Sequence, residues 1–429
     1  MTLPQAPDSP EEPGRGVAAR LRRTTIDLTP LRVSPAYRRL LVGDAVSVLG
    51  TQITAVAVPI QVYEQTRSAA AVGFVGLAGL LPLIVFGLYG GAIADAVDRR
   101  RLVLLTTAGQ AVLSSVLLLQ ALADVRSTPL LYAVIAAQAG LFAIDSPARG
   151  AFTPRLLPPE LLPAANALRQ VEFNIGVTLG PLLAGVLVAG PGYAWAYGLD
   201  ALTFTATLWS VAKLPSMAPE GGGRKAGTAS VLEGLAFLRT RPVLLMTFVV
   251  DLIAMVFAMP RALFPVLAVQ VYGGGPQTAG ALYSALAAGA LLGALFSGWF
   301  GRVHRQGLAV LVAIVAWGVS ITLFGLTDQL WFGLLMLAAA GVSDMVSAVF
   351  RSAILQSAAP DEMRGRLGGV FIVVVAGGPR LGDGRAGLGS ELVGPQGAVV
   401  AGGLVVVGLT AACAAAVPRF RQYDVRERM

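Results

Sequence analysis

The chain has 429 residues, of which 55% are hydrophobic and only 13% are charged. Soluble domains carry about 25% charged residues, so this composition excludes an ordinary soluble enzyme or binding domain. The formal net charge is +8. In a membrane protein such a charge follows from the basic residues of the cytoplasmic loops, whereas the competing explanation is a surface that binds nucleic acid. No nucleic-acid partner is expected. A single cysteine, Cys413, and a single histidine, His304, exclude a disulfide framework and a thiol or histidine metal cluster, so no cofactor or metal is expected.

Apolar stretches long enough to cross a bilayer, which takes about 20 residues, recur along the whole chain. They predict an all-α membrane protein with twelve transmembrane helices. The eleventh stretch is the least regular, because it contains Arg380, Asp383 and Arg385. The predicted spans are 40–62, 70–93, 102–123, 129–148, 167–190, 193–213, 243–268, 279–300, 307–326, 331–350, 367–390 and 396–417.

Lysine and arginine residues are distributed unequally between the two sets of loops. Nearly all of them lie on the side that includes both termini, whereas the loops of the other side contain only Arg67 and Arg126. Because basic loops stay in the cytoplasm, both termini are predicted to be cytoplasmic, in a multi-pass protein of the cell (inner or plasma) membrane.

The chain contains an internal repeat. The segment Arg149–Glu160, after the fourth span, matches Arg351–Glu362, after the tenth, at Arg, Ala, Pro and Glu positions, and the Gly180-Pro181 step of the fifth span recurs in the eleventh. Repeats at nearly constant spacing predict two six-helix halves. The predicted domains are a disordered cytoplasmic tail 1–36, an N-terminal half 37–213, a cytoplasmic linker 214–242 with an amphipathic helix, a C-terminal half 243–417 and a cytoplasmic tail 418–429.

The loop between the second and third spans is rich in charge: it contains Asp95, Asp98 and three successive arginines. Charges at a membrane boundary are costly unless they pair or face water, so this loop is unlike a simple connection. Gly91, Asp95, Arg99 and Arg100 resemble the loop motif of the major facilitator superfamily of secondary transporters, with Asp98 where glycine is commonest. That resemblance implies a substrate site between the halves, near the middle of the membrane.

Segments elsewhere in the chain narrow the resemblance. They are similar to the enterobactin-exporter branch of the superfamily, whose members expel siderophores; wider relatives expel macrolides and other drugs. The segments are Ser34–Arg38, Ala57–Gln61, Trp195–Gly198, Arg261–Pro265 and Pro360–Arg366.

By the same resemblance, the charged loop acts as a conformational latch. Asp95 would lie at the N-terminus of the eleventh span, where the helix dipole favours an anion. Arg99 would pair with Asp145 at the inner end of the fourth span, and these contacts, with Gly91 and Arg100, would close the cytoplasmic side in the outward-open state. The alternative is a basic cluster that only sets topology.

The sequence contains no motif for ATP-driven transport or enzymatic catalysis. The only lysines, Lys213 and Lys225, do not follow the glycine pattern of a P-loop, and no Gly-x-Ser-x-Gly nucleophile motif occurs. We therefore predict that the protein is not an enzyme and uses an ion gradient or the gradient of its substrate.

Carboxylates are the candidates for proton coupling, because the predicted spans contain no histidine. The resemblance implies that spans 1, 4, 7 and 10 line the cavity, and these carry Asp44, Asp145, Asp251 and Asp344. An aspartate in mid-helix costs about 2.5–3.5 kcal/mol to insert, which favours a water-filled pathway over lipid contact. Asp251 and Asp344 lie deeper and are the stronger candidates for protons or substrate; Asp44 and Asp145 lie near the inner ends, where structural ion pairing is the alternative.

Arg261, next to Pro260 in the seventh span, is the principal candidate for binding substrate. A guanidinium can hold catecholate or carboxylate oxygens through two hydrogen bonds; the alternative is an arginine that reaches the outer surface. Arg380 and Asp383 lie three residues apart on the eleventh span and can neutralise each other, so their role stays open.

The fifth span carries a glycine-proline motif and a polar stripe. Gly176, Gly180, Pro181 and Gly185 resemble the antiporter motif of the superfamily, with Ala184 replacing one of two glycines, and small residues there would allow close helix packing. Polar side chains recur every four residues at Gln170, Asn174 and Thr178. Gln170 and Asn174 are further substrate-binding candidates.

These observations predict a secondary active exporter of a bulky, amphipathic, siderophore-like molecule, exchanging it for protons by alternating access. Its partners would be the small-molecule substrate, protons and the lipid bilayer, and a monomer is expected. The alternatives are a multidrug or macrolide efflux pump and, in a different class, a membrane sensor or assembly subunit that does not transport.

Overall fold

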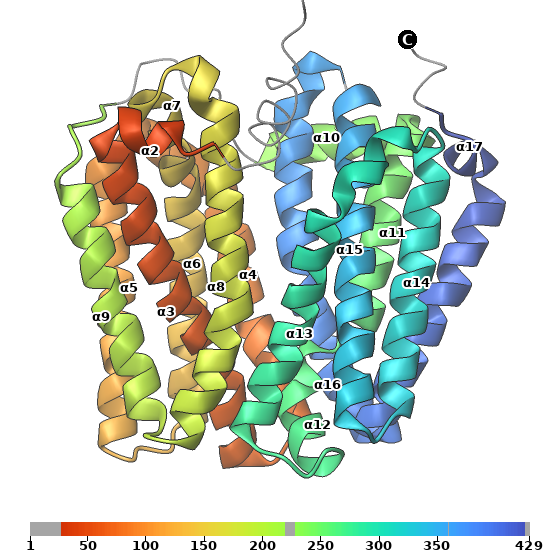
Figure 1. Ribbon diagram of the computed structural model, residues 1–429, viewed down its shortest axis with the longest axis horizontal. Coiled ribbons are helices and arrows are strands. Elements are labelled where there is room, and N and C mark those ends of the chain that lie inside the picture. Colours follow the sequence, from red (N-terminus) through yellow and green to blue (C-terminus); the bar gives the residue numbers. More distant parts are fainter. Residues whose placement is uncertain (1–26, 219–227, 359, 425–429) are drawn as a thin grey trace, which may run out of the picture.

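The computed structural model describes residues 27–218, 228–358 and 360–424, and every regular element within those ranges is a helix (Figure 1). Ten helical segments there are long and apolar enough to cross a membrane. One of them, Val374–Ala416, is interrupted at Gly394, where φ is +75°, and the chain reverses there to form two spans. Together with α9 (Tyr193–Ala212), this makes the twelve predicted transmembrane helices.

The first six spans form one bundle, and four of them begin at a side-chain cap. Ser34, Ser68, Asp98 and Ser127 each accept a hydrogen bond from the backbone N–H three residues later, which satisfies one of the free amides of a helix start. The spans of this half are α3 (Pro35–Thr66), α4 (Ala69–Ala96), α5 (Arg99–Leu122), α6 (Thr128–Gly150) with α7 (Phe152–Leu156), η1 (Pro159–Leu161) with α8 (Leu162–Ala189), and α9.

The other six spans form the second bundle. The helix predicted in the linker is α10 (Thr228–Thr240), which lies against α16 at the same end of the molecule as α2 (Thr29–Val33), α7 and α17 (Pro418–Arg421) (Figure 1). The spans of this half are α11 (Pro242–Ala258) with η2 (Arg261–Leu263) and α12 (Phe264–Gln270), α13 (Pro276–Leu295) with η3 (Ser297–Arg302), α14 (Gln306–Leu326), α15 (Leu330–Ala358) and α16 (Asp361–Ala416).

The seventh span is broken, whereas the sequence predicted it as one stretch. Pro260 has no backbone N–H, so the helix ends at Ala258 and resumes as η2 and α12. Two charged side chains of α16 satisfy the freed backbone groups: Asp383 accepts from the N–H of Ala262 at 3.2 Å, and Arg385 donates to the carbonyl of Phe257. The charges that made the eleventh span irregular therefore hold this break in place.

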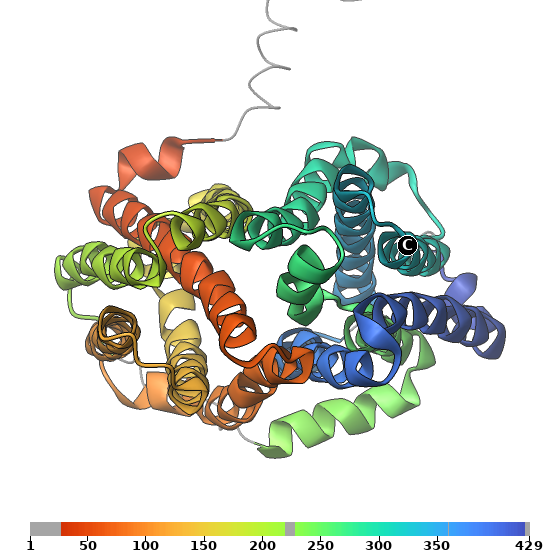
Figure 2. The same cartoon turned by 90° about the horizontal axis from the view of Figure 1, so that it is seen from below.

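The two bundles lie side by side and touch along two pairs of helices, α4 with α16 and α8 with α13 (Figure 2). Glycines bring these helices close: a Cβ on Gly73 would lie 2.5 Å from the carbonyl oxygen of Asp383, and one on Gly280 would lie 2.4 Å from that of Pro181.

Among the described residues, the hydrogen bonds between the halves lie toward the end opposite α10. Gln270 donates to Tyr63 at 3.1 Å, and Ser284 donates to the carbonyl of Thr178 at 2.8 Å. Ser68 donates to Glu391 at 3.1 Å. The halves are therefore fastened together at that end of the molecule.

Candidate functional site

A cavity of about 460 Å³ lies between the two halves and is lined by both of them. Most of its wall is apolar, and a small set of polar side chains reaches it from six elements. These are Thr51 and Thr54 on α3, Gln110 on α5, Gln138 on α6, Asp200 on α9, Arg261 on η2, and Arg380 and Asp383 on α16.

Arg261 faces this cavity and not the outer surface. The break at Pro260 places it on η2, and its guanidinium carbon lies 5.6 Å from the centre of the Tyr283 ring. The Tyr283 hydroxyl donates to the Arg261 carbonyl at 2.9 Å, which fixes the backbone beneath the side chain. A cation held over an aromatic ring keeps its five N–H donors free for a ligand.

Arg380 and Asp383 do not simply neutralise each other. Arg380 donates to the carbonyl of Ala376 on its own helix at 2.8 Å, whereas Asp383 accepts from the N–H of Ala262. Between these two described side chains there is no direct hydrogen bond. Arg261 and Arg380 thus bring two guanidinium groups to one cavity, with the single carboxylate of Asp383 beside them.

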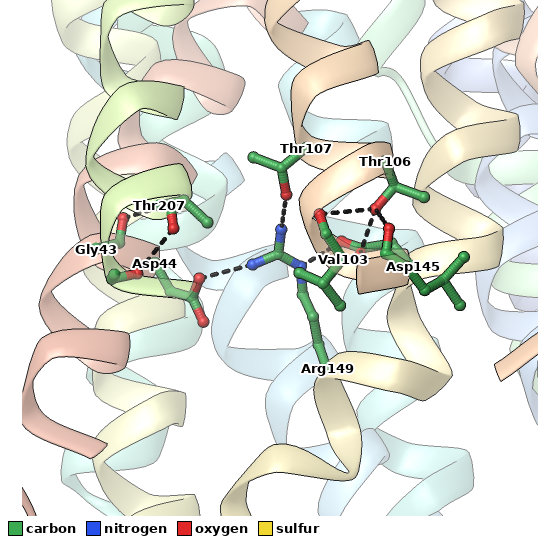
Figure 3. Close-up of polar contacts among 10 residues, drawn as sticks. Gly43, Asp44, Val103, Thr106, Thr107, Asp145, Arg149 and Thr207 are labelled. Carbon is green, nitrogen blue, oxygen red and sulfur yellow. Dashed lines mark hydrogen bonds and ion pairs between the residues drawn. The ribbon is translucent and has the colours of Figure 1, made fainter. Parts of the chain in front are cut away.

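A largely buried charge cluster lies within the N-terminal half, near the end of α6 that adjoins α7 (Figure 3). Arg149 of α6 donates to Asp44 of α3 and to Thr107 of α5, both at 2.7 Å, and also to Asp145 one turn earlier on its own helix. Asp145 accepts a further hydrogen bond from Thr106 at 2.8 Å. One guanidinium therefore compensates two carboxylates and joins three helices.

The C-terminal half contains a corresponding cluster. Arg351 of α15 pairs with Asp251 of α11 at 2.6 Å and donates to Ser347 at 3.1 Å. Asp344 lines the same small internal space as Asp251 but, among the described residues, has no direct hydrogen-bond partner. Asp251 is therefore a paired carboxylate.

The two arginines of these clusters were not among the predicted site residues. Arg149 and Arg351 occupy matching positions in the internal repeat, and each follows an aspartate on the same helix. This pattern could have predicted both arginines, because a basic residue that recurs in both halves together with an acid on the same helix indicates a duplicated ion pair.

Comparison with known proteins agrees with this architecture. A family model described as "Transmembrane secretion effector" matches residues 25–429. The chain belongs to this family of the major facilitator superfamily. The enterobactin exporter EntS of Citrobacter koseri is 32% identical over 389 residues, which cover 90% of this chain and 92% of that protein. EntS of Escherichia coli O1:K1 is 31% identical with the same coverage.

Solved structures of distant superfamily members share the fold. The nucleoside transporter NupG has 12% identity and a TM-score of 0.72, covering 91% of this chain and 100% of its own. A bacterial homologue of the iron transporter ferroportin, in an inward-facing state, has 15% identity and a TM-score of 0.65, covering 90% and 98%. At such identities the likeness shows the fold alone.

The superfamily loop motif forms contacts different from those expected. Asp145 is bonded to Arg149 and Thr106, and the expected pair between Asp145 and Arg99 is not formed. The side chain of Asp95 and the surroundings of Gly91 lie outside the described residues.

Asp98, where the superfamily favours glycine, has a structural role. It caps α5 through the N–H of Arg101 at 2.9 Å and accepts from the Ser216 hydroxyl and the N–H of Met217, so it anchors the start of the linker. Partial burial opposes ionisation, but these hydrogen bonds outweigh it and lower the pKa of Asp98. Arg100 adds a contact within the same half, donating to the carbonyl of Ala212 at 2.6 Å.

The glycines of the antiporter-like motif lie at helix crossings. A Cβ on Gly176 would be 2.5 Å from Val48 of α3, and one on Gly180 would be 2.4 Å from Gln52. Gly185 and Pro181 instead face α13 of the other half. The motif therefore packs α8 against both bundles.

The polar stripe of α8 contacts the other half only through the backbone of Thr178, among the described residues. Gln170 donates to Asn174 at 3.3 Å, and Gln170 is exposed. Thr178, next in the stripe, accepts from Ser284 of α13 through its carbonyl. Gln170 and Asn174 are not among the residues that line the cavity; they lie nearer the α10 end of α8.

Proposed function

We propose that this protein exports a bulky, amphipathic, siderophore-like small molecule across the cell membrane, in exchange for protons, by alternating access. The observation that carries the proposal is the cavity between the halves, with Arg261 and Arg380 in its wall. Its volume of about 460 Å³ is typical of small-molecule sites, which span about 300–1,000 Å³. The relatives that are named as enterobactin exporters support the direction of transport and the class of substrate.

Arg261 and Arg380 are the proposed substrate-binding cations. A catecholate or carboxylate presents paired oxygens, which match the fork of a guanidinium. Asp383 fixes the break beside Arg261 through the N–H of Ala262, so it positions that cation. Gln170 and Asn174 would contact substrate only as it enters from the α10 side.

The two charge clusters are the proposed sites that respond to protons. Protonation of Asp251 would release Arg351 from its ion pair, and Asp344 is close enough to become a second acceptor. Protonation of Asp44 would leave Arg149 paired with Asp145 alone, which frees α3 from this ion pair. Because each arginine joins several helices, a change in its pairing alters the packing of the half to which it belongs, which shifts the balance between conformations. Asp95, Arg99, Arg100 and Gly91 would then act as the latch in the outward-open state.

The orientation proposed from the basic loops places the α10 end in the cytoplasm. The cytoplasmic side would then be the open one in this conformation, because the hydrogen bonds between the halves that involve described side chains lie toward the other end. Substrate would enter from the cytoplasm and pass between the two charge clusters before it reaches Arg261.

Flux through proteoliposomes tests the proposal. Purified protein with an imposed pH gradient should move enterobactin, and dissipation of the gradient should stop net uphill flux. Binding of enterobactin without flux would support the sensor alternative, and faster flux of macrolides than of enterobactin would support the drug-efflux alternative. Arg126→Ala, at an exposed site, is the matched control for Arg261→Ala.

A further inference from the structure

Asp200 of α9 is a buried carboxylate that belongs to neither charge cluster. Its side chain lines the central cavity, yet the residue is only 1% exposed. Its Oδ2 accepts hydrogen bonds from the hydroxyls of Thr54 on α3 and Ser114 on α5, both at 2.7 Å. The Ser114 oxygen in turn accepts from the amide of Gln138 on α6 at 3.3 Å. Four helices thus meet at one acid.

This acid has no counter-charge. Among the described residues none forms an ion pair with Asp200, and its Oδ1 is buried without a hydrogen-bond partner. That oxygen lies against α3, where a Cβ on Gly50 would be 2.8 Å away. An ionised carboxylate with only neutral donors is costly to bury, so the arrangement favours a neutral, protonated acid until something stabilises its charge.

The charged groups on the surrounding helices lie about two turns or more, along the helix axes, from Asp200 and its hydrogen-bond partners. Thr54 is ten residues from both Asp44 and Glu64, or about 15 Å at 1.5 Å per residue. Tyr197, one turn away on α9, donates to Gln61. Further charged or titratable groups on these helices are Tyr37, Arg38, Arg39 and Tyr63 on α3, the three arginines that begin α5, Tyr132, Asp145 and Arg149 on α6, and Tyr193 and Lys213 at the two ends of α9. Arg261, Arg380 and Asp383 line the cavity from the other half.

The two hydroxyls around Asp200 differ in freedom. A hydroxyl has one donor and two acceptor lone pairs. Ser114 accepts from Gln138, so its own hydrogen is directed to Asp200 in either protonation state. Thr54 lines the cavity, and the direction of its hydrogen bond with Asp200 can reverse. When Asp200 is protonated, it donates to Thr54, and the Thr54 hydrogen points into the cavity; when Asp200 is ionised, Thr54 donates to it and offers only lone pairs to the cavity.

We propose that Asp200 is a proton site of the central cavity. Through Thr54, the proton on Asp200 and a substrate group that donates a hydrogen bond to Thr54 exclude each other. A phenolic hydroxyl or ammonium group that donates to the Thr54 oxygen turns the Thr54 hydrogen toward Asp200 and stabilises the carboxylate. The proton leaves Oδ2 for water in the cavity. No covalent bond other than this O–H bond changes. The inference deepens the proposed function, because mutual exclusion of proton and substrate is what exchange transport requires.

The mechanism distinguishes donors from acceptors. A ligand that only accepts hydrogen bonds at Thr54 is compatible with protonated Asp200 and displaces no proton. Enterobactin with free catechol hydroxyls and enterobactin with those hydroxyls methylated are therefore the decisive pair of probes.

Proton release on binding tests the coupling. In weakly buffered detergent solution with a pH indicator, enterobactin should release protons from the wild type, and the methylated compound should not. Asp200→Asn and Thr54→Val should bind enterobactin without that release, Thr54→Ser should retain it, and Asp124→Asn, at an exposed turn, is the control. Release from Asp200→Asn equal to wild type, or equal release from the Val and Ser variants, would overturn the inference.

A second measurement needs no substrate. Infrared difference spectra across a pH titration should show a carboxylic-acid band in the wild type that Asp200→Asn lacks and Asp124→Asn retains. Absence of that band means that Asp200 is not a proton site, even if export is normal. Presence of the band with no enterobactin binding would instead reject the proposed substrate and leave the proton site standing.

Discussion

Removal of Arg351 should destabilise the transporter more than almost any other single change in the C-terminal half. The side chains of Arg351 and Asp251 are 12% and 5% exposed and lie 2.6 Å apart. Arg351→Met leaves the Asp251 charge buried and uncompensated, which costs about 3–5 kcal/mol. Replacing both partners by apolar residues removes the charge as well, so Arg351→Met with Asp251→Leu should recover most of that loss.

Reversible unfolding in mixed detergent micelles, followed by tryptophan fluorescence, measures this difference. Arg302→Met, at an exposed residue, serves as the control and should change the free energy of unfolding by less than about 0.5 kcal/mol. The double variant should be folded yet fail in proton-driven flux, which separates the structural from the functional role of the pair. Wild-type stability in Arg351→Met, or no recovery in the double variant, would refute the reasoning.

Three other predictions concern substrate, loop and topology. Arg261→Ala should lower the affinity for anionic substrates by about 10- to 150-fold, which corresponds to the loss of one charged hydrogen bond. In direct binding assays Arg261→Lys should recover only part of that affinity, because an ammonium group lacks the planar fork of a guanidinium. Equal losses of affinity for neutral substrates would argue against this role. Asp98→Ala should cost about 1 kcal/mol of stability at neutral pH, because a helix cap is lost. The folded-state pKa of Asp98 is lowered, so this contribution is present above its unfolded pKa and disappears as pH falls through the folded value. The free energies of unfolding of the wild type and Asp98→Ala should therefore converge in acid. A difference that stays constant with pH would contradict the prediction. A cysteine at Gly222, in the linker outside the described residues, should resist an impermeant reagent on intact cells, and labelling there would reverse the proposed orientation.

The sequence was sufficient to predict the helices, their number and their duplication. Each span must be apolar over about 20 residues whatever its neighbours are, so span positions are a local property. The aspartates of the cavity helices and Arg261 were also visible, because a charge within an apolar stretch requires a reason to be there.

The partners of those charges were decided only by the tertiary structure. Spacing along one helix predicts neighbours at three and four residues, which fits Arg149 with Asp145, but says nothing about the pair with Asp44 on another helix. The expected pair of Arg99 with Asp145 is not formed in this structure, and whether it forms depends on how two helices are rotated and how deeply each lies.

Tertiary packing likewise decided the roles of the charges on the eleventh span. Asp383 and Arg385 hold the break at Pro260 from a helix more than a hundred residues away in sequence. Asp200 appeared in the sequence as one acid in an apolar stretch; only the meeting of Thr54, Ser114 and Gln138 around it shows that its neighbours are neutral and that the cavity reaches it. Long-range contacts depend on helix depth, rotation and the direction of side chains, and these are set by packing of the whole bundle and not by the local apolar pattern.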